Sequence, residues 1–188
     1  MDTSMRKARG FTLLELIMVI SIVGILAAVG TASFKYLTTS NRIATEINGL
    51  LGDMQFARSQ AIKIGTFVSV CPSTDSASCT GSATWGTGWI VFLDYNGNGT
   101  FDSGTDKVLR VQGSIAPDTL VGSDPNFKFL TFNREGFGTN SLSAWTSLTL
   151  NSSPTNVQWR RCMAVSAVGA LTIVRSGQTT PPPPPITC

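Results

Sequence analysis

The longest apolar run of the chain covers residues 10–34, with the sequence GFTLLELIMVISIVGILAAVGTASF. Glu15 is its one charged residue, and residues 16–34 carry no charge. About 20 apolar residues are enough for a helix to cross a hydrocarbon core of ~30 Å. A carboxylate in such a segment is costly to bury, so it indicates a functional role. The pattern predicts a transmembrane helix over residues 11–34, with Glu15 as a functional residue.

The residues before this run are basic. Residues 1–10, MDTSMRKARG, contain Arg6, Lys7 and Arg9. Basic residues before an apolar segment favour a cytoplasmic N-terminus, with the rest of the chain outside. An ordinary signal peptide places a small-residue cleavage site after its apolar run. No such site stands out here, and the run continues into a helical pattern instead.

A second pattern follows, in which apolar residues recur every three or four positions. The charged residues Arg42, Glu46, Asp53, Arg58 and Lys63 fall outside this stripe. Such spacing predicts an amphipathic helix over residues 35–64 that packs its stripe against a sheet, and Gly65 ends it. The stripe consists of Ile43, Ile47, Leu50, Met54, Ala57 and Ala61.

The rest of the chain predicts short strands. The last two strands flank Ala167-Val168-Gly169, which predicts a hairpin turn. A long helix followed by short antiparallel strands is typical of the α+β class, with a globular domain over residues 65–176. Within one strand, Phe127, Phe129 and Phe132 cannot all face one side. The predicted strands are residues 66–71, 89–94, 107–112, 127–133, 147–150, 161–166 and 170–175.

Composition limits the possible functions. The 188 residues suffice for one domain and an anchor, and residues 11–188 carry 11 basic and 10 acidic residues. This balance gives no global basic field for nucleic acid. The chain has no histidine, which removes Ser-His and Cys-His nucleophilic pairs. No carboxylate pair lies in an apolar context suited to acid–base catalysis. We therefore expect a non-enzymatic protein without a cofactor.

Four cysteines lie beyond the apolar run: Cys71, Cys79, Cys162 and Cys188. An even number in an exported domain favours disulfides, and four cysteines allow three connectivities. Closeness in the sequence favours the pairs Cys71–Cys79 and Cys162–Cys188. No C-x-x-C spacing supports a zinc site. The tail, residues 177–188, contains five consecutive prolines at 181–185 and predicts a stiff polyproline II spacer, or alternatively a proline-rich ligand.

The sequence Gly10-Phe11-Thr-Leu-Leu-Glu15 before a long apolar run resembles the class III leader of type IV pilins and pseudopilins. The resemblance implies that a prepilin peptidase removes residues 1–10 by cutting between Gly10 and Phe11. It also implies methylation of the new amine on Phe11. Glu15 would then pair with the N-terminal amine of a neighbouring subunit in the apolar filament core.

Three later blocks resemble the FimT/FimU/GspH group of minor pilins. They are FARSQAIKIGTFVSVCPS at 56–73, WGTGWIVFLDYNGNG at 85–99, and R-C-x-x-x-S-x-x-G at 161–169. The resemblance implies a type IV pilin fold and a minor pilin that acts in pilus initiation or in the tip complex. Expected partners are other major and minor pilins in a hetero-oligomeric filament, and the prepilin peptidase. The chain would reside in the bacterial inner membrane, with a periplasmic domain, and then in the surface pilus. H-type pseudopilins of type II secretion are an alternative.

One loop resembles the front of an EF-hand calcium site. Oxygen-bearing side chains stand at Asp94, Asn96, Asn98 and Asp102. The twelfth position is a threonine where a bidentate glutamate is expected. The alternative is a polar turn between two strands, for which Asn-Gly is a strong signal.

A small basic cluster is the last candidate site. Arg160, Arg161 and Arg175, with an adjacent tryptophan, are the residue types that bind phosphates and stack on bases. Some FimT-like pilins bind DNA for natural transformation through a G-R-x-R motif in the C-terminal hairpin. The matching place here, residues 169–172, reads GALT and lacks both arginines. The sequence therefore favours a structural role over DNA binding.

Overall fold

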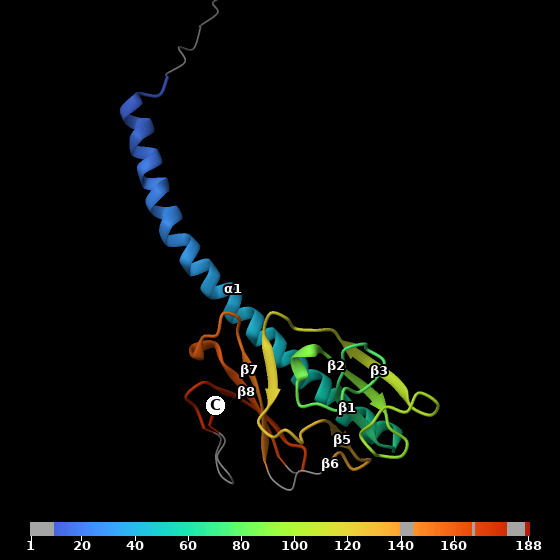
Figure 1. The fold of residues 1–188 in the computed structure, drawn as a ribbon. Helices are drawn as coiled ribbons and strands as arrows, with labels where there is room; N and C mark the ends of the chain where they lie inside the picture. The colour runs from blue at the N-terminus through green and yellow to red at the C-terminus, as the bar shows by residue number, and fades with distance from the viewer. Residues whose placement is uncertain (1–9, 140–144, 167, 180–186) are drawn as a thin grey trace, which may run out of the picture. The chain divides into compact units, whose positions relative to one another are not determined.

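The computed structural model describes residues 10–139, 145–166, 168–179 and 187–188 (Figure 1). The chain divides into two compact units, Met1–Thr38 and Thr39–Cys188, which are described separately below. Three predictions fall outside the described residues: the leader before Gly10, Ala167 in the hairpin turn, and the proline run at 181–185.

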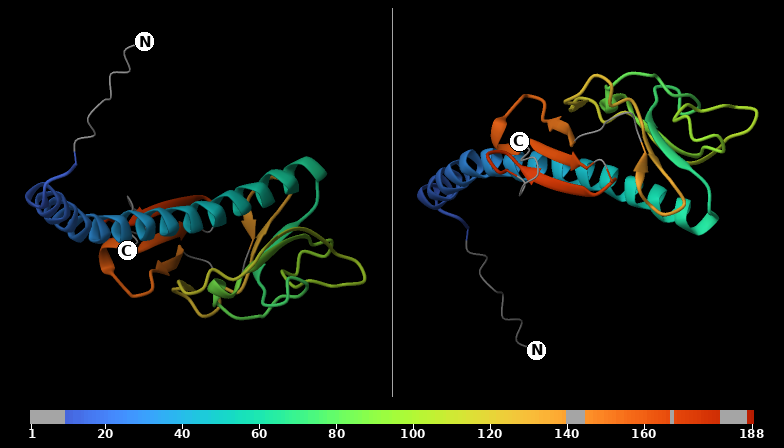
Figure 2. Two further views of the ribbon diagram at one scale, coloured as in Figure 1. Left: turned by 90° about the horizontal axis from the view of Figure 1, so that it is seen from above. Right: turned by 90° about the horizontal axis from the view of Figure 1, so that it is seen from below.

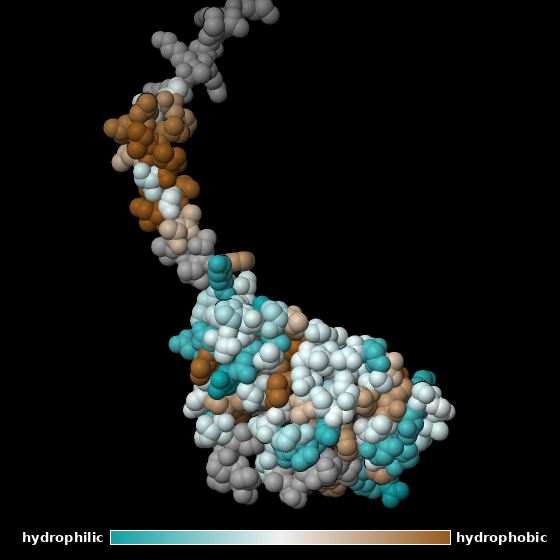
Figure 3. Space-filling model, viewed as in Figure 1, coloured by the Kyte–Doolittle hydropathy of each residue, from teal (hydrophilic) through white to brown (hydrophobic). Residues whose placement is uncertain are grey.

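Helix α1, Leu13–Ile64, accounts for all the regular structure described in the first unit. The large apolar side chains of this unit are exposed along the helix. Leu13 near its start is 76% exposed, and Leu26 is 66% exposed. Figure 3 shows brown, apolar residues over much of this segment, with paler residues between them. Within the part of the chain that the structure describes, no helix combines the length and the apolar character needed to cross a membrane.

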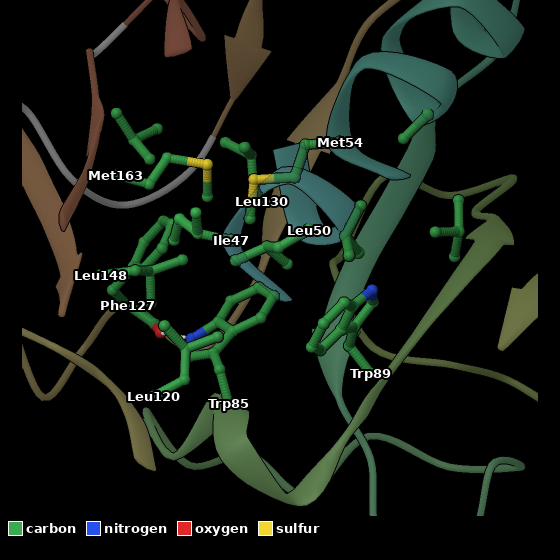
Figure 4. Close-up of a cluster of buried hydrophobic side chains, with 14 of the residues drawn as sticks. Ile47, Leu50, Met54, Trp85, Trp89, Leu120, Phe127, Leu130, Leu148 and Met163 are labelled. Carbon is green, nitrogen blue, oxygen red and sulfur yellow. Dashed lines mark hydrogen bonds between the residues drawn. The ribbon is translucent and has the colours of Figure 1, made fainter. Parts of the chain in front are cut away.

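In the second unit α1 buries one stripe only. All six apolar positions predicted at intervals of three and four are buried, from Ile43 to Ala61. Full burial of an aliphatic side chain contributes about 1.5–3 kcal/mol. Figure 4 shows Ile47, Leu50 and Met54 directed into the core. The amphipathic prediction for this half of the helix is confirmed.

Two antiparallel sheets complete the second unit. The five-stranded sheet has the order β3-β2-β1-β5-β6, and the four-stranded sheet has the order β4-β7-β8-β9. The α+β fold class is confirmed. The first sheet consists of β1 (Val68–Pro72), β2 (Trp89–Leu93), β3 (Lys107–Gln112), β5 (Leu130–Phe132) and β6 (Gly138–Thr139). The second consists of β4 (Thr119–Gly122), β7 (Thr146–Asn151), β8 (Arg161–Val165) and β9 (Leu171–Arg175).

The strand predicted over residues 127–133 is shorter than expected, because only Leu130–Phe132 pairs as β5. Phe127 leaves the strand and stacks on Trp85, with ring centroids 5.4 Å apart. Its carbonyl also accepts a hydrogen bond from Trp85 Nε1 at 3.1 Å. Phe132, inside β5, lies in the main core together with Phe127, whereas Phe129, just before β5, packs against the smaller cluster, so the three do not share one side. Strands β4 and β6 have no counterpart among the predicted strands.

The main core lies between α1 and both sheets (Figures 2 and 4). Helix residues contact Val91 of the first sheet and Leu148 and Met163 of the second within one buried cluster. A smaller cluster around Ile90 and Phe92 lies apart from it. Strand β2 therefore buries all five of its residues, which explains its uninterrupted apolar sequence.

Backbone contacts join the two sheets. Gly138 in β6 donates its N–H to the carbonyl of Val168, between β8 and β9, at 3.1 Å, and Gly122 in β4 donates to the carbonyl of Ala83, between β1 and β2, at 2.9 Å. A Cβ on Gly138 would lie 2.8 Å from Gly169 Cα. Gly169 has φ +78°, and a Cβ there would lie 2.6 Å from the Gly138 nitrogen. Both positions therefore require glycine.

Candidate assembly motif and interaction sites

The N-terminal motif forms the start of α1. Thr12 precedes the first helical residue, and its Oγ1 accepts a hydrogen bond from the Glu15 N–H at 3.2 Å. The Thr12 carbonyl accepts the Leu16 N–H, also at 3.2 Å. Thr-x-x-Glu is the capping-box sequence, and a carboxylate in the first turn is favoured by the helix dipole. Sequence reasoning missed this cap, although the spacing of Thr12 and Glu15 signals it.

The predicted cleavage site lies outside the helix. Gly10 and Phe11 precede Leu13, and Phe11 is 79% exposed. Glu15 is also exposed and has the exposed apolar residues Leu14 and Leu16 beside it. A lone carboxylate among apolar side chains is stable in apolar surroundings only if a cation pairs with it. This segment therefore offers an accessible peptide bond and one site for a cationic group.

The structure pairs the four cysteines locally. Cys71 bonds to Cys79 and Cys162 bonds to Cys188, each with a Cα–Cα distance of 5.6 Å. The first bond attaches a loop beside the smaller apolar cluster on the first sheet. The second attaches the C-terminal residue to β8, so each sheet carries one covalent cross-link.

The loop after β2 is closed by the buried carboxylate of Asp94. This carboxylate accepts hydrogen bonds from Ser69 Oγ at 2.7 Å and from the Gly97 and Gly99 N–H groups at 2.7 and 2.8 Å. Four donors in all, including the Asn98 N–H, satisfy its two oxygens. The contacts of Asp94 are therefore those of a polar turn, which the sequence offered as the alternative to a calcium site.

The remaining calcium candidates bind one another. Asp102 Oδ2 accepts hydrogen bonds from the side-chain amides of Asn96 at 2.9 Å and Asn98 at 3.2 Å. Asp106 in turn accepts the Tyr95 and Asp102 N–H groups. Among the described residues, no group of three or more His, Cys, Asp or Glu side chains is arranged to hold a metal ion. Calcium binding stays a prediction.

The three candidate arginines lie close together. Arg161 and Arg175 are directly opposite each other in the β8–β9 pair. The Arg160 carbonyl accepts the Ser176 N–H at 3.3 Å, and Arg160 Nε donates to Asn151 Oδ1 at 2.8 Å. These contacts place all three at one end of the second sheet.

A second charged cluster lies at the same end and was missed from the sequence. Arg42 binds both carboxylate oxygens of Asp118, at 2.6 and 2.7 Å. Asp118 Oδ1 also accepts the Ser153 N–H at 2.8 Å. Burial, with contributions from the Asp118 charge and hydrogen bond, raises the pKa of Glu46 to about 7, and Arg42 lowers it less. Glu46 Oε2 is buried without a hydrogen-bond partner.

Asp53 connects α1 to the first sheet. Its carboxylate accepts hydrogen bonds from Trp89 Nε1 at 2.9 Å and from Arg110 Nη1 at 3.0 Å. The Arg110 guanidinium lies 3.6 Å from the centre of the Phe56 ring, in a cation–π contact. These contacts fix the helix against β2 and β3.

Comparisons with known proteins agree with this arrangement. The model of the family described as "Type II transport protein GspH" matches residues 46–169, and that of the "Prokaryotic N-terminal methylation motif" matches residues 5–31. The chain is also similar to the type IV minor pilin FimU of Pseudomonas aeruginosa in two crystal forms. In the first, the TM-score is 0.54 at 17% identity, covering 75% of this chain and 92% of FimU. In the second, the TM-score is 0.50 at 18% identity, covering 70% and 90%. At such identities, these similarities show a shared fold.

Proposed function

The chain belongs to the type II transport protein GspH family, and from this premise we propose that it acts in the initiating or tip complex of a type IV pilus. It is a minor pilin or pseudopilin that carries an N-terminal methylation motif. Proteins of these families are structural and non-enzymatic. The expected partners are other pilins, together with the peptidase that removes the leader.

The observation that carries this proposal is the exposed apolar surface of α1 in the first unit, with Glu15 as its one charge. Before assembly, residues 11–34 would stay in the inner membrane with the globular unit in the periplasm. After the cut between Gly10 and Phe11 and methylation of Phe11, the segment would enter the apolar filament core. There Glu15 pairs with the amine of a neighbouring subunit, because an unpaired charge is costly at low dielectric.

The experiment compares two substitutions of Glu15 in cells. Glu15→Val removes the charge and the polar side chain, whereas Glu15→Gln keeps a side chain suited to the capping box but removes the charge. Both variants should lose residues 1–10 normally. Both should enter filaments about tenfold less or worse, because the amine of the neighbouring subunit is left unpaired.

Two outcomes would contradict the proposal in different ways. Normal incorporation of Glu15→Gln, with loss only in Glu15→Val, would show that the residue acts as a helix cap. Mass spectrometry that found residues 1–10 still attached to the wild-type protein would refute the processing step and the assembly mechanism together.

A second candidate, the H-type pseudopilin of type II secretion, is favoured by the name of the matching family model. Deletion of the gene separates the two roles, since loss of pili without loss of secretion supports the pilus and the reverse supports secretion. DNA uptake has less support, because residues 169–172 lack the arginines of the DNA-binding motif. Mobility-shift assays with Arg160→Ala and Arg161→Ala test it.

A further inference from the structure

An open cavity of about 420 Å³ lies at the surface of the globular unit, where α1 ends. Three segments line it: residues 65–67 directly after α1, Tyr95 in the loop after β2, and residues 133–135 in the turn between β5 and β6. All of them belong to the unit Thr39–Cys188. The volume lies within the range of about 300–1,000 Å³ that is typical of small-molecule sites.

Two aromatic side chains line this cavity. Phe67 is half-buried and, among the described residues, belongs to neither buried apolar cluster. Its ring lies against the backbone of Gly97, because a Cβ on that glycine would come within 3.0 Å of the ring. Tyr95 is 58% exposed. The two rings therefore offer flat apolar surface to a ligand, since neither is taken up by the core.

The lining also carries polar groups that are available to a ligand. The Asn133 side-chain oxygen accepts the N–H groups of Glu135 at 3.1 Å and Phe137 at 2.9 Å, which leaves its amide nitrogen as the available end. Within the described residues, no hydrogen bond is formed by that nitrogen, by the Thr66 hydroxyl or by the Tyr95 hydroxyl. A ligand that displaces water from these groups must supply hydrogen bonds of its own, because an unpaired polar group weakens binding.

The charges of the lining cancel. Arg134 Nε donates to Glu135 Oε1 at 2.8 Å, so the one cation and the one anion of the lining pair with each other. A phosphate group would meet a guanidinium that already has a carboxylate partner, and would gain little from it. The lining therefore favours an uncharged ligand.

The walls of the cavity are fixed by contacts within the chain. Asp94, the residue before Tyr95, donates its N–H to the Phe67 carbonyl at 3.0 Å. A Cβ on Gly136 would lie 2.8 Å from Ile62 Cδ1, so the turn between β5 and β6 packs closely on the end of α1. A site that is formed in advance binds its ligand at a lower cost in entropy.

We propose that this cavity binds a sugar ring of an uncharged glycan. A pyranose ring has an apolar face of C–H groups and a rim of hydroxyl groups, which match the aromatic rings and the available hydroxyl and amide groups of the lining. An apolar peptide side chain would cover those polar groups without giving them partners, so it fits the cavity less well. The inference goes beyond the proposed function and does not depend on the membrane anchor or on Glu15.

Two sources share this chemistry, the glycan strands of the cell wall and glycans outside the cell. The test titrates the full chain, in a detergent that contains no sugar, with triacetylchitotriose as the wall-type probe and with lactose and mannobiose as the other probes. The NMR signals of the Phe67 and Tyr95 rings should shift saturably with at least one probe. The shift should be the same at low and high salt, because no net charge takes part. The probe that binds more tightly identifies the source.

Substitutions in the lining separate the two kinds of contact. Tyr95→Ala removes a ring and should weaken binding about tenfold. Tyr95→Phe and Thr66→Val each remove one hydroxyl with little change of shape, and each should weaken binding about threefold. The matched control is Phe137→Ala, which removes a 51% exposed ring outside the lining and should keep the wild-type affinity.

Three results would overturn the inference: no saturable shift with any probe, a Tyr95→Ala variant that binds as tightly as the wild type, or a shift that disappears at high salt. Saturable binding of a proline-rich peptide, with no binding of the sugars, would assign the cavity to a protein partner and overturn it too. Thermal unfolding checks that each variant is folded, and the two hydroxyl variants carry the test if Tyr95→Ala is not.

Discussion

The two halves of α1 use apolar residues in different ways. In the first unit, apolar side chains surround the helix and are exposed, as Leu16 is at 58%. In the second unit, they form one stripe, and Leu50 in that stripe is fully buried. The second half finds its partners in the two sheets of the same chain. The large apolar side chains of the first half are exposed instead, so they are the surface that the proposed contacts with a membrane and with other subunits would cover.

The two glutamates of the helix sharpen this contrast. Glu15 is exposed in the apolar half and accompanies the Thr12 cap. Glu46 is half-buried between Arg42 and Asp118, and its raised pKa follows from contacts inside the globular unit. The first is therefore expected to affect assembly, and the second to affect folding.

The largest expected effect comes from the buried stripe. Leu50→Ala removes a fully buried side chain and should lower the free energy of unfolding by about 4 kcal/mol. Leu16→Ala, the matched change in the exposed half, should change it by less than about 0.5 kcal/mol. Denaturant unfolding of the full chain in detergent measures both. Similar losses in the two variants would contradict the division of the helix into two halves.

A smaller effect is expected from the covalent cross-links, which belong to the globular unit alone. Cys162→Ser with Cys188→Ser opens a bond between residues 26 positions apart and should lower the free energy of unfolding by about 3 kcal/mol. The control pair Cys71→Ser and Cys79→Ser, eight positions apart, should lower it by somewhat less. Hydrogen exchange in residues 13–26 should stay unchanged in both, and a change there would show that the halves are coupled.

The smallest effect concerns pH. The folded state raises the pKa of Glu46 from 4.5 to about 7, so the folded protein holds this proton more strongly than the unfolded chain does. The resulting stabilisation is complete below pH 4.5 and is lost as the pH rises to about 7. Glu46→Gln should therefore be more stable than wild type above pH 7, by about 1 kcal/mol after solvent screening, and equal near pH 4.

Thermal unfolding across this pH range measures the effect. Glu15→Gln is the control and should show the pH dependence of the wild type, because Glu15 lies outside the globular unit. A Glu46→Gln variant whose advantage did not grow with pH would refute the explanation based on burial.

Much of the fold follows from local sequence patterns. The stripe from Ile43 to Ala61 is predictable because a helix repeats its faces every three or four residues. Strand β2 is predictable as an apolar run because both of its faces are covered. Strands β4 and β6 are not, since they have only four and two residues, and β4 also depends on β7, which lies about 30 residues later in the sequence. Phe127 left its predicted strand because Trp85, 42 positions away, offers it a stacking partner.

The candidate sites also differ in whether their residues are close together or far apart in the sequence. The Thr12 cap is readable from four consecutive residues, and the opposition of Arg161 and Arg175 follows once the last hairpin is predicted. The ion pair of Arg42 with Asp118 joins residues 76 positions apart, so no local pattern indicates it. The raised pKa of Glu46 comes first from burial and then from Asp118, so it is equally inaccessible from the sequence.

The cap at Thr12 has a consequence for maturation. Among the described residues, the groups that cap the first turn are the hydroxyl and the carbonyl of Thr12, which lies downstream of the Gly10–Phe11 bond. A protease that cuts there would leave Thr12 in place, so the new end of the chain would keep this cap at the moment of its release. The start of the helix would then not need to refold after cleavage, and the cleaved subunit could enter a filament at once.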